Sequence, residues 1–270
     1  MNQSSLLVII SDTHIGSNTA ISPSKFTIHN RNTLEAQTLQ ANRLQEWLLA
    51  CWQDFWNYVF MLRGKGKHAR KLIVVHCGDV IDGNHHGSMQ LMQEVGDQIV
   101  IARELLEPIV NKANKFYGIL GTGAHAGQDN SDEVALYKGL SIEFGQQITL
   151  DIDGVVHDFA HHGRAGRRPW TSSAANIATE VMIDYASCGM KPPDYIWRGH
   201  NHLIDDSGCK LKGTRAISLP SWQLKTSYGW KAAANTVRSD IGGMIVIDGI
   251  LDDSHARYCG QPNERKIIKV

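Results

Sequence analysis

The sequence lacks a disulfide pattern, a paired-thiolate motif and any long hydrophobic run. Its 270 residues include only five cysteines, an odd number with no Cys-x-x-Cys pair. Scattered cysteines of this kind are typical of reduced thiols in a protein core, which argues against a disulfide scaffold and a thiolate zinc site. No stretch approaches the ~20 apolar residues of a membrane span, and the apolar run at residues 6–10 is too short for a signal peptide. We therefore expect a cytoplasmic protein with no membrane partner.

The chain also lacks an excess of either charge. Lys and Arg total 27, as do Asp and Glu, so the net charge is zero at pH 7 with neutral histidine. Proteins that hold many phosphates of long nucleic acids usually carry a basic excess, so we expect no long duplex nucleic acid as a partner. Histidine, in contrast, is abundant, with 13 residues. Because histidine is the commonest metal ligand, the positions of these residues carry the most information.

Short apolar runs that end in polar turns predict buried strands. They cover residues 6–10, 72–75 and 116–120, and further strands are predicted near 148–151, 155–160, 195–197, 214–219 and 244–247. The Asp153-Gly154 pair predicts a tight hairpin. Apolar residues at helical spacing predict helices over 34–62, 88–115, 132–140 and 174–187. Strands alternate with helices first and pair as hairpins later, which predicts a mixed two-sheet α/β sandwich in one domain, residues 1–270.

The predicted helix over residues 34–62 is unusually aromatic. It carries Trp47, Trp52 and Trp56 among other apolar side chains. We expect this face to lie in the core or to form a self-association surface, rather than a platform for stacking bases. A homo-oligomer formed through this helix is therefore one expectation.

Five predicted strand ends carry acidic and histidine side chains. They are Asp12-Thr13-His14, Gly78-Asp79-Val80-Ile81-Asp82-Gly83, Gly121-Thr122-Gly123-Ala124-His125, His161-His162-Gly163 and Gly199-His200-Asn201-His202. Each block alone is typical of a solvated turn or a hydrogen-bonded core histidine. Five in series indicate a common site, because functional residues of an α/β sheet gather at the carboxyl ends of its strands. Carboxylates that bridge two divalent ions, with neutral imidazoles completing each shell, suit Mn, Fe, Zn or Co.

These blocks resemble the motif series of the calcineurin-like metallophosphoesterases. That series is Asp-x-His, Gly-Asp-x-x-Asp-Gly, Gly-Asn-His, a His followed by a small residue, and Gly-His-x-His. Four of the five blocks stand in this order between Asp12 and His202. The resemblance implies a four-layer α-β-β-α sandwich of two mixed β-sheets flanked by helices. It also implies two divalent transition-metal ions and hydrolysis of phosphate monoesters or diesters by a metal-activated hydroxide.

The resemblance also implies a role for each matching residue. Asp12, His14 and His202 would hold the first ion, and Asp79 would bridge the two. His200 would hold the second ion with either His161 or His162, of which His162 is preferred because it directly precedes Gly163. Asp82 would orient one of the ligand histidines.

The third block departs from the family series. It lacks the asparagine whose carbonyl binds the second ion, and its histidine is displaced by two residues. Thr122 could replace that ligand through its hydroxyl, or a water could do so. His125 is expected to protonate the leaving oxygen as general acid, provided that its loop curls back toward the site.

Other functions and other residues stay open at this point. A nuclease or nucleotide-processing phosphodiesterase would use the same centre, whereas a non-catalytic metal-binding scaffold would be expected to lose several blocks, and only one is altered here. Near the fourth block, Arg164, Arg167 and Arg168 with Trp170 form either a phosphate clamp or a charged surface loop. His85 and His86 either line the pocket rim or lie in a solvated loop.

Overall fold

Two mixed β-sheets form the centre of the fold. The structure, a computed structural model, describes residues 4–30, 32–33, 35–84, 90–162, 173–208, 213–226 and 238–262. The first sheet has the order β13 (Ile250–Asp252), β12 (Met244–Ile247), β1 (Ser5–Ile10), β4 (Lys71–His76), β5 (Lys115–Ile119) and β6 (Glu143–Gly145). Strands β1, β4, β5 and β6 run parallel to one another. Strand β12 pairs antiparallel with β1, and β13 pairs antiparallel with β12.

The second sheet is mixed as well. Its order is β10 (Asp205–Asp206), β11 (Arg215–Ser218), β9 (Tyr195–Arg198), β8 (Val155–Ala160) and β7 (Gln147–Ile152). The three inner strands are parallel and both edge strands are antiparallel to their neighbours. The hairpin β7–β8 turns at Asp153-Gly154, as the sequence predicts; both residues have positive φ, which an Asp-Gly pair adopts readily.

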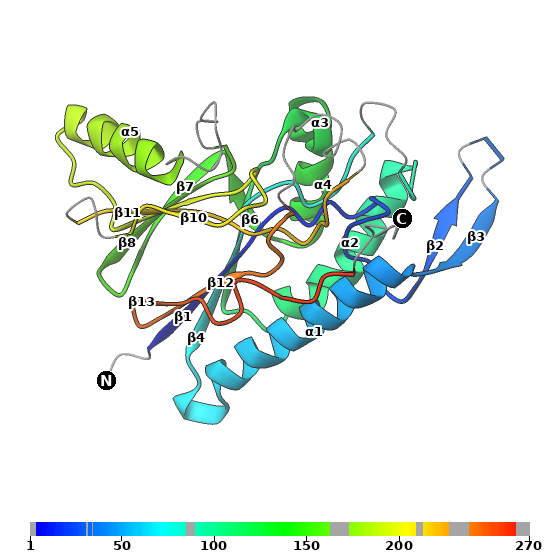
Figure 1. Cartoon of the computed structure of the whole chain (residues 1–270), viewed down its shortest axis with the longest axis horizontal. Helices are drawn as coiled ribbons and strands as arrows, with labels where there is room; N and C mark the ends of the chain where they lie inside the picture. The colour runs from blue at the N-terminus through cyan, green and yellow to red at the C-terminus, as the bar shows by residue number, and fades with distance from the viewer. Residues whose placement is uncertain are drawn as a thin grey trace, which may run out of the picture.

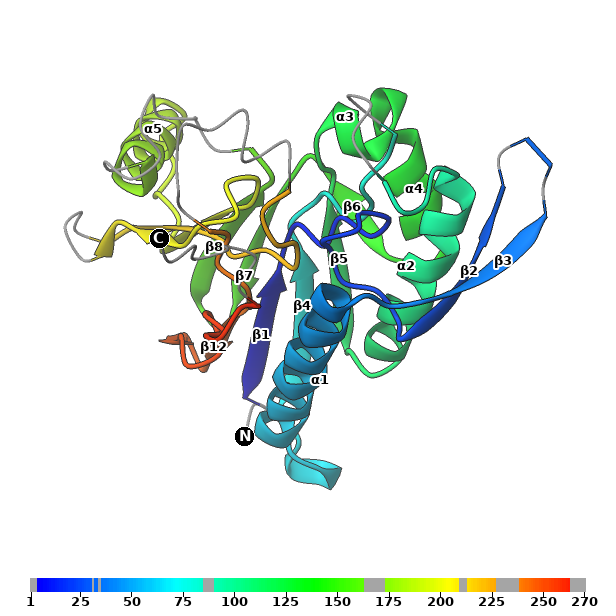
Figure 2. The same cartoon turned by 45° about the vertical axis from the view of Figure 1, so that its right-hand side comes forward.

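Helices cover the outer face of each sheet (Figures 1 and 2). The longer ones are α1 (Arg43–Arg63), α2 (Val95–Val110), α4 (Ser131–Gly139) and α5 (Ser173–Ser187), and the shorter ones are α3 (Gly123–Ala126), η1 (Gly66–His68) and η2 (Gln128–Asn130). Helices α1, α2 and α4 lie beside the first sheet, and α5 lies beside the second.

Alternation along the parallel strands accounts for the layers. In β1, Leu6 and Val8 pack into a core shared with α1 and α2, whereas Leu7 and Ile9 pack toward the second sheet against residues such as Trp197. A third, smaller core joins α5 to the second sheet through Ile177, Ala178, Ile196 and Ala216. The order is therefore helix, sheet, sheet, helix, which confirms the predicted four-layer α-β-β-α sandwich.

The helix predicted over residues 34–62 begins later than expected. Asn42 caps α1: its side chain accepts hydrogen bonds from the N–H groups of Leu44 (2.8 Å) and Gln45 (3.1 Å), and the Gln45 side chain accepts from Asn42 N–H. The preceding residues form β3 (Ala36–Gln40), which pairs with β2 (Lys25–His29) in a hairpin that projects from the body (Figures 1 and 2). The helical prediction for residues 36–42 is therefore wrong.

The aromatic face of α1 lies in the core. Trp52, Phe55 and Trp56 are buried, and Trp222 packs edge-on against Trp52 and Phe55, with ring centroids 4.8 and 5.6 Å apart. This confirms the core interpretation for these residues. A groove of about 420 Å³ runs along α1 and α2, lined partly by Trp52, Trp56, Phe60 and Pro108. Self-association through this helix stays a prediction.

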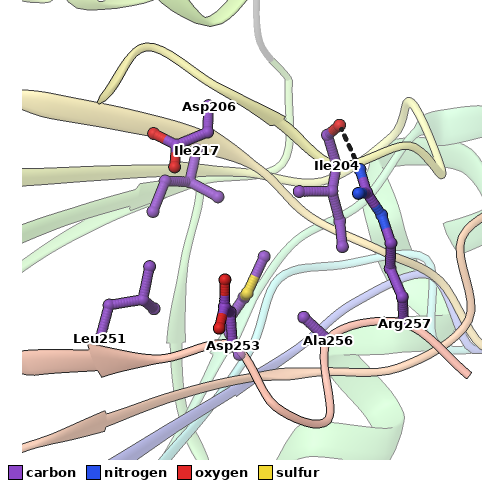
Figure 3. A pocket seen from close by; sticks show the side chains of 8 residues that line it. Ile204, Asp206, Ile217, Leu251, Asp253, Ala256 and Arg257 are labelled. Carbon is purple, nitrogen blue, oxygen red and sulfur yellow. Dashed lines mark hydrogen bonds between the residues drawn. The ribbon is translucent and has the colours of Figure 1, made fainter. Parts of the chain in front are cut away.

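A small pocket lies where β10 and β11 come near β12 and β13 (Figure 3). Its volume is about 120 Å³, and it is lined by Ile204, Asp206, Ile217, Met244, Leu251, Asp253, Ala256 and Arg257. Arg257 donates a hydrogen bond to the Ile204 carbonyl at 3.2 Å. None of the five acidic and histidine blocks lines this pocket.

Within the described part of the chain, no helix combines the length and the apolar character that a membrane span requires.

Candidate metal centre

The carboxyl ends of β1, β4, β5, β8 and β9 bring all five blocks together. Parallel pairing of β1 with β4 places the turns after both strands side by side, and Asp12 N–H donates to the Gly78 carbonyl at 3.0 Å. From the second sheet, His200 N–H donates to the Asp12 carboxylate at 3.0 Å. The site therefore spans the two sheets, as expected from strand ends that meet at one edge.

Asp12, His14 and His202 form the first group of candidate ligands. Their ligand atoms lie within 4.8 Å of one another. His14 Nε2 lies 3.1 Å from His202 Nε2 and 3.7 Å from Asp12 Oδ1, and His202 Nε2 lies 3.3 Å from the same oxygen. Two imidazole nitrogens this close repel through their lone pairs unless a proton or a metal ion lies between them. The arrangement fits a bound cation.

Asp79 lies at the middle of the cluster. Its Oδ2 is 3.1 Å from His161 Nε2, 3.9 Å from His14 Nε2 and 4.0 Å from His125 Nε2. Its Oδ1 accepts hydrogen bonds from the N–H (2.6 Å) and hydroxyl (3.1 Å) of Thr122. Thr122 thus orients the carboxylate, and its own role as a ligand stays a prediction.

His161, His162 and His200 form a second group. Their ring centroids lie 5.0 to 5.3 Å apart, and their candidate ligand atoms lie within 4.8 Å. His161 Nδ1 donates to the Cys77 carbonyl at 2.6 Å, which leaves the Nε2 lone pair facing Asp79. Within the described chain, this buried Nε2 makes no hydrogen bond. His161 is therefore the member of the doublet that faces Asp79, whereas the sequence favours His162, which is exposed.

His125 reaches the cluster in spite of its displacement. The single turn of α3 curls the chain back, with His125 N–H donating to the Thr122 carbonyl at 3.0 Å. His125 Nδ1 lies 2.8 Å from the Asp82 carbonyl, and its ring packs edge-on against His14 at 4.4 Å. Gly83 permits this approach, because it has positive φ and a Cβ there would lie 2.4 Å from the His125 carbonyl oxygen.

Asp82 contacts two histidines of the cluster. Its Oδ1 lies 3.6 Å from His14 Nδ1 and 3.8 Å from His125 Nδ1. Gln90 donates to its other oxygen at 3.1 Å and so steadies the carboxylate. The Asp82 carboxylate thus lies beside both rings, and its role in orienting a ligand histidine stays a prediction.

Five candidate ligands have left-handed backbone conformations, which only a few non-glycine residues adopt. Their φ angles are 52° for Asp12, 41° for His14, 52° for Asp79, 71° for His200 and 55° for His202. Such strain is typical of functional sites, where the surrounding structure holds side chains in place. The sequence pattern carries no signal for this feature.

The cluster attracts positive charge. Burial alone would lower the pKa of His14, but the carboxylates of Asp12, Asp82 and Asp79 outweigh burial and raise its pKa to about 10. Burial would also lower the pKa of His161, but the carboxylates of Asp79 and Asp12 outweigh burial and raise this pKa to about 9. Burial and then the neighbouring His161 lower the pKa of His162 and His200. The carboxylates therefore bind either protons or a metal ion, while the two exposed imidazoles keep free lone pairs.

Glu133 is a buried residue of the site that the sequence does not reveal. It lies in the first turn of α4, where acidic residues are common, so nothing in the sequence marks it out. Its Oε1 accepts from Val80 N–H and its Oε2 from Gly121 N–H, each at 2.7 Å. Burial and then the Asp79 carboxylate raise the pKa of Glu133 to about 7. Glu133 joins the two turns that carry Asp79 and Thr122.

Glu133→Gln is expected to destabilise the protein and weaken metal binding. The amide offers one acceptor oxygen, so one of the two buried N–H groups loses its partner, at a cost of about 1–3 kcal/mol in the free energy of unfolding. Urea denaturation of the metal-free protein measures this loss. Glu143→Gln, at an exposed position of β6, serves as the matched control. Equal stability of the two variants would contradict a stabilising role for the two hydrogen bonds that Glu133 accepts.

Some sequence-predicted residues lie outside the described part of the chain. They are His85, His86, Arg164, Arg167, Arg168 and Trp170. The interpretations of these residues as a pocket rim and a phosphate clamp stay predictions.

Comparison with known proteins gives distant structural matches. No protein-family model matches the chain, and no curated protein matches it. Vacuolar protein sorting 29 from Cryptosporidium parvum is 12% identical, with 91% of this chain and 86% of that chain covered and a TM-score of 0.47. The same protein from Entamoeba histolytica, in complex with Zn²⁺, is 12% identical, with 89% of this chain and 84% of that chain covered and a TM-score of 0.40. A predicted phosphoesterase from Streptococcus pneumoniae is 12% identical, with 96% of each chain covered and a TM-score of 0.39.

The chain's own features carry its resemblance to the calcineurin-like metallophosphoesterases. Two mixed sheets lie between helices in four layers, as that resemblance implies. The ordered Asp and His blocks lie together at one end of both sheets, as clusters able to hold metal ions. In fold and in the placement of these blocks, the structure therefore agrees with what the resemblance implies.

Proposed function

We propose that this protein is a metal-dependent phosphoesterase with a centre for two divalent transition-metal ions. The carrying observation is the position of Asp79, whose Oδ2 lies 3.1 Å from His161 in one direction and 3.9 Å from His14 in the other. Asp12, His14 and His202 would hold one ion, and His200 with either His161 or His162 would hold the other. Asp79 would be shared.

The chemistry of the donor side chains fits such ions. The buried His161 Nε2 faces the Asp79 carboxylate at 3.1 Å, and His14 and His202 direct nitrogens at each other across 3.1 Å. Mixed imidazole and carboxylate ligation suits Mn, Fe, Zn or Co. Bound there, two ions supply Lewis acidity toward phosphate oxygens and lower the pKa of water.

We assign His125 the protonation of the leaving oxygen. Its Nδ1 is held by the Asp82 carbonyl at 2.8 Å, which turns Nε2 toward the cluster. Carried on Nε2, a proton can pass to an oxygen that departs from phosphorus. Asp82 fixes the ring so that this nitrogen stays in place.

His125→Ala is expected to lower turnover by ~10²–10⁴-fold, the usual contribution of a positioned acid. The loss should shrink for a nitrophenolate leaving group, which needs little protonation. Turnover of nitrophenyl and alkyl phosphoesters, with metal content measured in parallel, tests this. Metal content should stay unchanged; loss of one equivalent would make His125 a ligand instead.

We further propose a phosphoester substrate of small size and a cytoplasmic location. The zero net charge supports neither a long duplex partner nor a polyanionic one. Cys51, Cys77, Cys188 and Cys259 are free, which supports a reducing compartment.

Metal loading and a substrate panel test the function. Protein stripped with EDTA is reloaded with Mn²⁺ or Zn²⁺, and its metal content is measured by elemental analysis. Bis-nitrophenyl phosphate, nitrophenyl phosphate and single-stranded DNA then distinguish diesterase, monoesterase and nuclease. We expect up to two ions per chain and hydrolysis only with metal. Bound metal without hydrolysis of any substrate would indicate a scaffold, and absence of both would overturn the proposal.

A further inference from the structure

The second group of candidate ligands contains three imidazoles, one more than the first group. His161, His162 and His200 lie together: their rings meet edge-on at interplanar angles of 64° to 79°, with centroids 5.0 to 5.3 Å apart. Edge-on contact also occurs between core aromatic rings such as Trp52 and Trp222, so the nitrogen positions decide what this group can do. One nitrogen from each lies within 4.8 Å of the others.

We infer that His162 is itself a metal ligand, so that the second ion lies among three imidazoles and the Asp79 carboxylate. This inference rests on the proposed metal centre and names its donor set. His161 contributes Nε2, because its Nδ1 proton is given to the Cys77 carbonyl. His162 and His200 are the exposed members of the group, which leaves an open side through which an ion can enter.

The local backbone explains how neighbouring residues reach one ion. Successive side chains of a strand point to opposite faces, so a doublet inside β8 would be split between two faces. Strand β8 ends at Ala160, and the chain bends at His161. The bend brings both rings to the same side, 5.0 Å apart, with His200 across from them.

Thr122 directs its hydrogen-bond donors at the shared carboxylate. Both its N–H and its hydroxyl are directed at Asp79 Oδ1, at 2.6 and 3.1 Å. In this inference the third imidazole nitrogen, rather than an oxygen of the third block, completes the shell of the second ion.

The two sites then differ in chemistry. The first offers two imidazoles with the carboxylates of Asp12 and Asp79, whereas the second offers three imidazoles with Asp79 alone. Nitrogen-rich, four-ligand sites suit Zn²⁺ and Co²⁺, and oxygen-rich ones suit Mn²⁺ and Mg²⁺. We expect the second site to prefer Zn²⁺ over Mn²⁺ more strongly than the first.

Zinc titration of three variants of the full chain tests the inference. Each metal-free protein competes with a chromophoric chelator for Zn²⁺. The proteins are wild type, His162→Ala, His162→Asn and, as a control, His68→Ala at the exposed η1. We expect two sites in wild type and control. In His162→Ala one site should be unchanged and the other weakened by ~10²-fold or more, because even outer partners of a ligand contribute ~10–100-fold. His162→Asn, which offers a carbonyl oxygen, should recover part of the affinity.

A second readout is independent of affinity. Co²⁺ bound to four ligands absorbs more strongly in the visible than Co²⁺ in higher coordination, so loss of His162 should change the spectrum of one equivalent only. Unchanged zinc affinities and spectrum in His162→Ala would overturn the inference even if the enzyme hydrolyses phosphoesters. A weakened second site in a protein that hydrolyses nothing would support it while the proposed function fails. Wild type that binds no zinc would overturn it outright.

Discussion

Asp79→Asn is expected to remove metal-dependent hydrolysis while the chain still folds. The asparagine oxygen can accept the Thr122 N–H, now bonded to Oδ1 at 2.6 Å. Its NH₂ group then takes the place of Oδ2, 3.1 Å from His161 Nε2, and donates to that lone pair. The amide thus satisfies locally the nitrogen that would otherwise bind metal, and it brings no charge to share between two cations.

The expected loss of activity is large. Metal ions contribute several kcal/mol of charge stabilisation in the transition state, and ~1.4 kcal/mol corresponds to tenfold in rate. A loss of ~10⁴-fold or more in turnover therefore follows from losing one or both ions. Turnover at saturating Mn²⁺ and metal content by elemental analysis measure it. Asp184→Asn, on the exposed face of α5, is the control. Near-wild-type activity of Asp79→Asn would refute the proposal that two ions share the Asp79 carboxylate.

Asp158→Ala is expected to produce the largest loss of stability. Arg198 and Asp158 form a buried ion pair, with Nη2 to Oδ1 at 2.6 Å and exposed fractions of 5% and 0%. Gln147 also donates to Asp158 Oδ2, at 2.5 Å. Removing the carboxylate leaves the guanidinium buried without its counter-charge, which costs about 3–5 kcal/mol. Arg198 directly precedes the Gly199–His202 turn, so the site should loosen as well.

Chemical denaturation of the metal-free variants measures this effect. A double variant, Asp158→Leu with Arg198→Met, should recover most of the loss, because an apolar pair of similar volume carries no unpaired charge. Asp194→Ala, whose carboxylate is partly exposed, provides a control at the neighbouring turn. A loss below about 1 kcal/mol for Asp158→Ala would place the pair among surface ion pairs in its effect.

The buried parallel strands were predictable because their chemistry is local. β1 has six buried residues in a row, and a strand buried on both faces needs a continuous apolar run such as residues 6–10. The ends of such strands must lie at one edge, so the meeting of the five blocks followed from their order. Residue identity, strand direction and sheet edge together were enough.

The hairpin β2–β3 was missed because it has almost no buried face. Apart from Phe26, which is buried, its side chains are mostly exposed, so no period-two apolar pattern marks the strands. Leu39 fell instead into the helical spacing of the following segment. Pairing of the two backbones, rather than side-chain pattern, defines this element.

Three features of the site depend on contacts between residues far apart in the chain. Glu133 acts through the N–H groups of Val80 and Gly121, which no spacing in the sequence connects to it. The orientation of His161 depends on the Cys77 carbonyl, 84 positions away. The positive φ angles depend on the packing of the turns themselves. Such information exists only once the sheets are assembled.

The division of the candidate ligands between the two sheets couples metal binding to the order of folding. His14 follows a strand of the first sheet and His202 a strand of the second, and they meet although they are 188 positions apart. Because closing so long a loop is slow, the group of Asp12, His14 and His202 is complete only once the sheets have docked. Once bound, the ion is a cross-link between them. Separation of the sheets must then release the ion, so amides at the sheet interface should exchange with solvent more slowly as metal concentration rises.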